Sequence, residues 1–325
     1  MKFRRLAHAL LLLAPFVLVI GALAALSPIL APKNNQADLG QIDPRANGIL
    51  GEPRDSIDVL FLGDSEVYTS IDPLQLWRER GVTSYDVSTS AQPLPYTRTL
   101  LKRALEHQNP EVVVLETNML FRKVGLDDAV AREVLDAFPS LEYHNRWKSI
   151  KPVDFTAEPR TTWTHERKGH RPSPHIQASS AKGYMTPTDE RAEISFLNKL
   201  YLSGLIDICR ERGIKVVLLS TPSTKNWSWK RHNAVEDYLA SRPEIEDDVS
   251  YLDLNLERQA VPIDWSTDTQ DAGDHLNSSG AQKVSTFLAS WLTDRYDLVD
   301  HRGDAAYRSW DGLGEGASKQ EDGLD

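Results

Sequence analysis

The middle of the chain alternates between short apolar runs and longer stretches with helical periodicity. The apolar runs predict strands at residues 57–62, 84–87, 111–115, 214–219 and 249–254. Between the runs, apolar residues recur every three or four positions, which predicts helices at 73–80, 95–108, 194–212, 233–240 and 279–295. Strands that are apolar at every position are typical of sheets covered on both faces. The order of elements therefore predicts a three-layer α/β/α fold with a mainly parallel sheet.

The N-terminal pattern is different, because residues 6–30 are apolar apart from one histidine and follow three basic residues. An apolar run of about 20 residues can cross a bilayer and is longer than the usual core of a cleaved signal peptide. We therefore expect residues 1–31 to be an uncleaved anchor of a single-pass membrane protein, with the rest of the chain extracytoplasmic. Cleavage is the alternative, because small alanines between positions 22 and 31 offer sites for a peptidase.

Two further segments lack apolar periodicity. Residues 32–54 are rich in Pro, Gly, Asn and Asp, which is typical of a linker. Residues 302–325 are rich in Gly and acidic residues and are expected to be disordered. One folded domain is then predicted for residues 55–301, with an insert at about 119–190.

The net charge of −10 argues against a nucleic-acid partner, because phosphate binding needs a clustered basic surface.

The most informative polar residues directly follow the first predicted strand, at Gly63, Asp64 and Ser65. A glycine permits a tight turn at the end of the strand. A serine at the carboxyl end of a strand lies where open α/β sheets bind their ligands. Its hydroxyl is therefore a candidate nucleophile, although a free hydroxyl reacts poorly until an oriented base takes its proton.

A suitable base and carboxylate occur about 200 residues later, at Asp271, Asp274 and His275. A histidine can accept the proton of Ser65, and an aspartate can orient the imidazole and stabilise its charged form. We therefore predict Ser65 as the nucleophile and His275 as its base. Either aspartate could orient the histidine.

Four separated blocks of the chain resemble those of the SGNH/GDSL hydrolase superfamily, and within it the extracytoplasmic branch akin to the DltD protein of lipoteichoic acid D-alanylation. The blocks are residues 61–65, 85–93, 114–118 and 271–277, and the resemblance covers residues 57–292. The resemblance implies an SGNH/flavodoxin-like fold and serine-dependent acyl-ester chemistry. It also implies a teichoic-acid-like polymer as substrate and a multi-spanning membrane acyltransferase as partner.

The resemblance further implies an oxyanion hole. The second block of the superfamily usually contributes the backbone N–H of a glycine, which must here come from Ser88, Ser90 or Ala91. The third block usually contributes an asparagine amide, and Asn118 occupies that place. Three further residues of these blocks are expected to line the site: Gly63, Asp64 and Gln92.

The last block departs from the pattern of the superfamily. The carboxylate usually lies three residues before the histidine, where this chain has Ala272. Asp271 or Asp274 must therefore take the role. A carboxylate four residues before the histidine can fold over the imidazole in a turn, whereas an adjacent side chain usually projects away, which favours Asp271.

Two loops are candidates for shaping the substrate site. Residues 221–233 directly follow a predicted strand, and Trp227 and His232 within them are expected to bind an acceptor glycan. The alternative is a loop anchored by one buried tryptophan, with Asn233 as the cap of the next helix. In the insert, Trp147 is expected to be a packing residue. The histidines between 165 and 175 fit no compact metal-ligand spacing, so no metal and no other cofactor are expected.

These residues predict an enzyme that forms an acyl-ester on Ser65. Passage of the acyl group to water would make it an esterase, and passage to a sugar or polyol hydroxyl would make it an O-acyltransferase. The expected substrate is a glycan or polymer of the cell envelope. The alternative is a non-catalytic surface module that keeps the fold and binds glycan or scaffolds an acyl-transfer complex.

Overall fold

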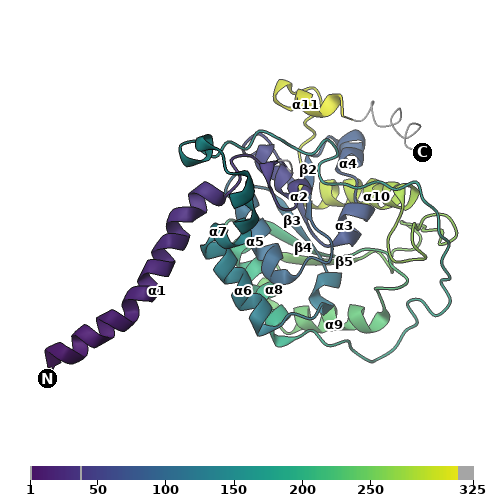
Figure 1. Ribbon diagram of the computed structural model, residues 1–325. Helices are drawn as coiled ribbons and strands as arrows, with labels where there is room; N and C mark the ends of the chain where they lie inside the picture. The colour runs from purple at the N-terminus through teal and green to yellow at the C-terminus, as the bar shows by residue number, and fades with distance from the viewer. Residues whose placement is uncertain (1, 37–38, 314–325) are drawn as a thin grey trace.

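A single parallel sheet forms the centre of the domain in the computed structural model, which describes residues 2–36 and 39–313 (Figure 1). Its strands are β1 (Val59–Gly63), β2 (Ser84–Ser88), β3 (Val112–Glu116), β4 (Lys215–Ser220) and β5 (Val249–Asp253). They lie in the order β2-β1-β3-β4-β5, and every neighbouring pair is parallel. The predicted fold class is therefore confirmed.

Helices cover both faces of this sheet (Figure 1). One face packs against α5 (Leu94–Ala104), α8 (Phe196–Arg210) and α9 (Trp229–Ala240). The other face packs against α3 (Ser65–Ser70), α4 (Pro73–Arg80) and α10 (Ser278–Tyr296). Helices outside these two layers include α1 (Lys2–Leu30), α2 (Pro44–Asn47), α6 (Leu126–Ala137), α7 (Pro139–Glu142) and α11 (Arg308–Asp311). Short 3-10 turns include η2 (Gly48–Gly51), η3 (Asn118–Phe121), η4 (His144–Ser149), η5 (Pro152–Phe155), η6 (Pro243–Ile245) and η7 (Ala305–Tyr307).

The continuous apolar run of β1 is explained by burial on both sides. Successive side chains of a strand point to opposite faces. Leu60 and Leu62 belong to the core beneath α5 and α8, whereas Val59 and Phe61 belong to the core beneath α3 and α10. All four side chains are fully buried. A polar residue at any of these positions would therefore be enclosed by helices.

The strand order creates a point of chain reversal at one edge of the sheet. The chain adds β2 on one side of β1 and then crosses over to add β3 on the other side. In sheets of this order, ligands bind outside the carboxyl ends of the strands at the point of reversal. Ser65 follows β1 and Asn118 follows β3, each after one intervening residue, so both lie at that point.

Helix α1 contains the span Leu11–Leu30, whose mean hydropathy of 2.3 and length of 20 residues suffice to cross a membrane. A signal sequence would meet the same criteria, so both alternatives from the sequence stand. The side chains from Leu11 to Ile20 are all exposed in the protein. In Figure 1 this helix leaves the domain on the side remote from α3 and α10.

The expected linker at 32–54 is partly built into the domain, which corrects that prediction. Ala46 and Ile49 are buried in the core, and the Tyr85 hydroxyl donates a hydrogen bond to the Arg45 carbonyl at 2.9 Å. Residues 44–51 form only single helical turns, which are too short to show apolar periodicity.

The expected disorder of the C-terminal segment is wrong for residues 302–313, and residues 314–325 lie outside the described residues. Trp310 in α11 is only 2% exposed, and its ring lies 5.5 Å from that of Trp77. One buried aromatic residue is sufficient to attach this otherwise exposed helical turn to the domain, and composition alone does not reveal it.

Three distant segments meet at this tryptophan. The Lys168 ammonium lies 4.7 Å from the centre of the Trp310 ring and forms a 2.7 Å ion pair with Glu52. Both charged side chains are buried, so each neutralises the other in a place where neither could remain charged alone. The contact fixes an internal point of residues 156–195, which contain neither helix nor strand.

Removing the Trp310 ring should destabilise the domain. We expect Trp310→Ala to lower the free energy of unfolding by about 3 kcal/mol, because it leaves a large cavity beside Trp77. The matched control is Trp147→Ala, since Trp147 is 65% exposed and its removal should have little effect. Urea denaturation of the full chain in mild detergent, followed by circular dichroism, measures both. Equal stability of the two variants would contradict the packing role of Trp310.

Candidate active site

Ser65 is the first residue of α3 and follows β1 after a single intervening residue. Asp64 caps this helix, because its side chain accepts a hydrogen bond from the Glu66 N–H at 3.0 Å. Gly63 allows the close approach of α3 to β3, since a Cβ there would lie 2.5 Å from Val67 and 2.6 Å from Glu116. The tight turn leaves the Ser65 hydroxyl at the carboxyl edge of the sheet.

A second tight turn, at residues 271–275, brings the histidine to the same place. Ala272 and Gly273 adopt left-handed backbone conformations, with φ of 59° and 90°. A Cβ at Gly273 would lie 1.9 Å from the Thr224 hydroxyl, so glycine is required on steric as well as conformational grounds. Asn277 then caps α10 by accepting from the N–H groups of its first turn.

The two turns create a hydrogen-bonded relay between three side chains. His275 Nε2 lies 2.7 Å from Ser65 Oγ, and His275 Nδ1 lies 2.5 Å from Asp271 Oδ2. Asp271 Oδ1 also accepts the backbone N–H of His275 at 2.7 Å. These contacts favour a proton on Nδ1, which leaves Nε2 free to accept the Ser65 proton.

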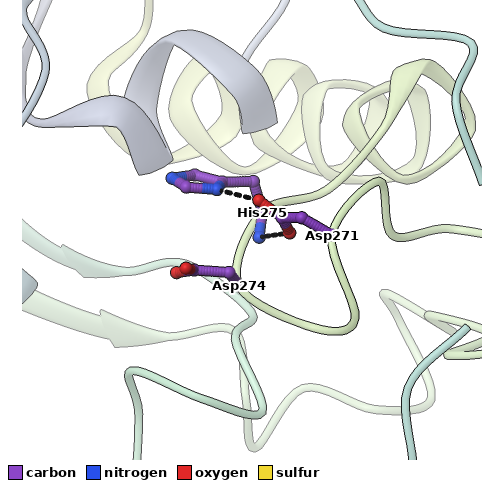
Figure 2. Close-up of side chains that lie close together, drawn as sticks. All are labelled: Asp271, Asp274 and His275. Atoms are coloured by element: carbon purple, nitrogen blue, oxygen red, sulfur yellow. Dashed lines mark hydrogen bonds and ion pairs between the residues drawn. The ribbon is translucent and has the colours of Figure 1, made fainter. Parts of the chain in front are cut away.

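Asp271, and not Asp274, contacts the imidazole (Figure 2). Asp274 lies near the ring without a hydrogen bond to it and accepts a hydrogen bond from the Asn226 amide. The difference arises from the turn at residues 271–275. This turn brings the carboxylate of Asp271, four residues before His275, to the imidazole ring. The geometry therefore agrees with the preference for Asp271 that the sequence suggested.

The ligand atoms of Asp271, Asp274 and His275 lie within 4.8 Å of one another, a spacing that a divalent cation could bridge. A cation bound by His275 Nδ1 would have to displace the proton that this nitrogen shares with Asp271. Metal binding at these three residues and a proton relay through His275 are therefore mutually exclusive.

Ser90 and Ala91 follow β2 and lie at the same edge, because Ser88 pairs with Gly63 in the parallel register. Both residues are exposed, and Ala91 has a left-handed φ of 52°. The Ser90 hydroxyl lies 2.9 Å from the Tyr68 hydroxyl, which ties this turn to α3. The backbone N–H groups of this turn therefore remain candidates for an oxyanion hole.

Gln92 has a different position from its neighbours, because its side chain is fully buried. Its amide donates a 3.0 Å hydrogen bond to the Thr97 hydroxyl in α5. This contact holds the loop that contains Ser90 and Ala91 against the start of the helix. The Gln92 side chain thus supports this loop from the core and is not exposed at the edge of the sheet.

The Asn118 amide points to carboxylates. Its Nδ2 atom lies 3.2 Å from Asp64 Oδ2 and 3.3 Å from Glu66 Oε1. Its Oδ1 atom accepts from the Arg231 guanidinium at 2.5 Å. Donation to an oxyanion would require one of the Nδ2 contacts to be exchanged, so the predicted role of Asn118 needs a rearrangement of this network.

Glu66 lies behind Ser65 and was not anticipated from the sequence. It is buried and accepts hydrogen bonds from Asn226 at 2.7 Å and from Thr221 at 2.8 Å. Burial, and then the charge of Asp64, raise the pKa of Glu66 from 4.5 to about 8. Below that pH, Glu66 is expected to be a neutral acid, and its hydrogen bonds connect the turn at Ser65 to Asn226 and Thr221.

Two arginines balance the charge of the surrounding carboxylates. Arg122 forms an ion pair with Asp64, and Arg231 lies over the Phe121 ring at 4.8 Å. Burial also raises the pKa of Glu116 well above its ordinary value. Asp64 follows β1, Glu116 ends β3, Arg122 follows η3 and Arg231 lies in α9, so no local sequence signal groups them. The only visible signal is the pair of acidic residues flanking Ser65.

Trp227 and His232 lie elsewhere than expected for an acceptor site. Trp227 is only 4% exposed, and its indole N–H donates to Asp253 Oδ2 at 2.9 Å. His232 Nδ1 contacts the same carboxylate oxygen at 2.9 Å, and this hydrogen bond is the main cause of a raised pKa of His232. The expectation that Trp227 stacks on a glycan is therefore wrong, and a buried tryptophan anchors the loop as in the alternative. The helix cap that the same alternative placed at Asn233 is also wrong, because Asn233 lies inside α9.

A cavity of about 670 Å³ lies beside β5. Ser179 lines it, and its hydroxyl lies 2.8 Å from that of Thr224, next to Gly273 of the relay turn. Other lining residues combine aromatic, aliphatic and cationic side chains, among them Tyr184, Val261, Trp265 and Arg258. Such a lining can accommodate a ligand with both apolar and polar parts.

Comparisons with known proteins give only distant likenesses. No protein-family model matches the chain, and no curated protein matches it. The solved structures that resemble it include a proposed platelet activating factor from Streptococcus pneumonia, at 14% identity and a TM-score of 0.37 over 73% of this chain and 84% of that chain.

Two further solved structures show a similar distance. A proposed acylhydrolase from Bacteroides fragilis is 12% identical, with a TM-score of 0.37 over 78% of this chain and 96% of that chain. A proposed GDSL-like lipase from Parabacteroides merdae is 11% identical, with a TM-score of 0.35 over 74% of this chain and 99% of that chain. At these scores the likenesses assign neither a family nor an activity to the chain.

The raised pKa of Glu66 predicts a pH-dependent effect of Glu66→Gln. Between pH 4.5 and about 8 the folded chain binds more protons than the unfolded chain, so its free energy of unfolding falls as the pH rises. In Glu66→Gln, position 66 cannot titrate, so this decrease in the free energy of unfolding is absent. The stability of the variant relative to the parent should therefore rise from pH 5 to 8, by up to about 1.4 kcal/mol per pH unit, and level off above pH 8.

Denaturant titrations at several pH values measure this difference. Glu106→Gln is the matched control, because Glu106 is exposed and lies just beyond α5. Its effect should not change with pH. A Glu66→Gln effect that is equally independent of pH would show that Glu66 titrates as it does in the unfolded chain.

Proposed function

We propose that the protein is an enzyme of the SGNH/GDSL superfamily that transfers acyl groups through Ser65, as an ester hydrolase or an O-acyltransferase. The relay from Ser65 through His275 to Asp271 is the single observation that supports this function most directly. Its three side chains come from positions up to 210 residues apart, yet both contacts have hydrogen-bonding geometry. An isolated structural turn would not need this arrangement.

The proposed reaction follows from the positions of the protons. Ser65 Oγ attacks the carbonyl carbon of an ester while His275 Nε2 takes its proton, and Asp271 stabilises the imidazolium. The imidazolium then protonates the leaving alkoxide, which departs and leaves an acyl ester on Ser65. Water or an acceptor hydroxyl attacks this ester, gives its proton to Nε2, and releases the acyl product with Ser65 restored.

The negative charge on the carbonyl oxygen must be stabilised during both attacks. The proposed donors are the backbone N–H of Ser65 and one from the turn at Ser90 and Ala91. Each such donor typically lowers the barrier by about 3 kcal/mol. Asn118 could join them by exchanging one of its contacts with Asp64 or Glu66.

We place this reaction outside the cell, on a glycan or polymer of the cell envelope. Helix α1 supports a membrane anchor through its length and hydropathy. A teichoic-acid-like substrate and a multi-spanning acyltransferase partner belong to the proposed relationship with DltD-like proteins. A surface module that binds glycan without catalysis is the competing function, and reaction of Ser65 separates the two.

The nucleophile can be tested with a fluorophosphonate probe and intact-protein mass spectrometry. The parent should gain one adduct at Ser65, whereas Ser65→Ala and His275→Ala should gain none, because one lacks the hydroxyl and the other lacks its base. A chelator should leave labelling of the parent unchanged. Absence of an adduct in the folded parent would favour the non-catalytic module, and loss of labelling with the chelator would favour a metal at the 271–275 turn.

The orienting carboxylate can be tested by comparing Asp271→Asn with Asp274→Asn. We expect the first to lower kcat/KM for a chromogenic acetyl ester by about 10³–10⁴-fold, because the amide disturbs the tautomer of His275. The second should lower it by less than about tenfold, since Asp274 contacts Asn226 and not the imidazole. The reverse order of effects would mean that the side chains exchange places in the working enzyme.

A further inference from the structure

Exposed apolar side chains gather in the turns that follow α7. Trp147, Val153 and Phe155 are 65%, 57% and 61% exposed. Lys148 and Lys151 lie between them and are also exposed. We call these five residues the η4–η5 surface. The expectation that Trp147 is a packing residue is therefore wrong, and this surface has no role in the proposed reaction.

The η4–η5 surface is held against the end of α1. The Ser140 hydroxyl donates to the Leu23 carbonyl at 3.0 Å, and the Arg146 guanidinium donates to the Leu30 carbonyl at 2.6 Å. Arg146 also pairs with Asp154 of η5 at 3.2 Å. Figure 1 shows these turns beside the domain end of α1. Any movement of α1 relative to the surface would break contacts to its main chain.

The lengths of the segments place the surface relative to a bilayer. The apolar span Leu11–Leu30 has 20 residues, which corresponds to about 30 Å of helix and matches the thickness of a hydrocarbon core. Contacts with the domain begin at Leu23, inside that span. If α1 crosses the membrane, the residues attached to its last two turns must lie at the boundary of the bilayer.

We propose that the η4–η5 surface inserts into the headgroup region of the membrane that α1 crosses. The proposal rests on the anchor of the proposed function. Tryptophan favours this region because its ring is amphipathic, and Val153 and Phe155 add apolar area that would otherwise face water. Lys148 and Lys151 can contact lipid phosphates beside them. The domain is thereby fixed in orientation, with α3 and the candidate site on the side remote from the anchor (Figure 1).

Another apolar surface fits this chemistry less well. Helix α6 exposes Leu126, Val130 and Val134 along one face. Exposed acidic residues accompany them, among them Asp127, Asp128 and Glu133. Anionic headgroups would repel these carboxylates, whereas they attract the lysines of the η4–η5 surface.

The surface can be tested by site-specific labelling, because Cys209 is the only cysteine and is buried. Single cysteines are introduced at three valines with similar exposure: Val153→Cys in the surface, Val299→Cys just after α10, and Val17→Cys within the span. Each full-length variant is labelled with a bimane and reconstituted into vesicles of phosphatidylcholine and phosphatidylglycerol. Brominated lipids then quench labels that lie within the bilayer.

We expect several-fold stronger quenching at positions 17 and 153 than at position 299. Replacing Lys148 and Lys151 with serine should weaken quenching at 153 in vesicles that contain phosphatidylglycerol, and should have less effect in pure phosphatidylcholine. Strong quenching at 17 with equal, weak quenching at 153 and 299 would overturn the proposal while leaving the anchor intact. Weak quenching at all three positions would overturn the anchor and the proposal together.

Discussion

The pairing of β1 with both β2 and β3 is the constraint on which the candidate site depends. Because all three strands are parallel, their carboxyl ends must meet at one edge, and the chain reverses its order there. Ser65 follows the central strand of this group and is therefore flanked by the turns after both neighbours. The apolar residues of β1 are enclosed by helices on both faces, so this edge is where polar groups can gather.

The carboxylates behind Ser65 give this edge both rigidity and a cost in stability. Asp64 and Glu66 flank the serine, and each is tied to groups that follow other strands. Buried charges cost free energy unless they are paired or neutralised. Arg122 pairs with Asp64, and protonation neutralises Glu66 below about pH 8. A serine whose neighbours are fixed in this way needs little reorganisation before His275 takes its proton.

The strands, the sheet layers and the relay could be predicted because each depends on a local pattern. Apolar runs mark β1 and β3, and the residue types near Ser65 and His275 indicate their chemistry. The contact between Glu66 and Asn226 joins residues 160 positions apart, and neither lies in a distinctive motif. Trp227 was misjudged because its burial depends on Asp253 in another strand, which the sequence of the loop does not contain. Both errors concern residues that are distant in the sequence and come into contact only when the chain folds.

The separation of 210 residues between Ser65 and His275 also determines the order in which the two side chains are made. Synthesis proceeds toward the C-terminus, so β1 and Ser65 are made well before the turn at residues 271–275. The segment beside that turn is fastened even later, when Trp310 reaches Lys168. Until that turn is made, Ser65 has no imidazole beside it, and it gains His275 as a hydrogen-bond partner only when these two distant parts of the domain meet.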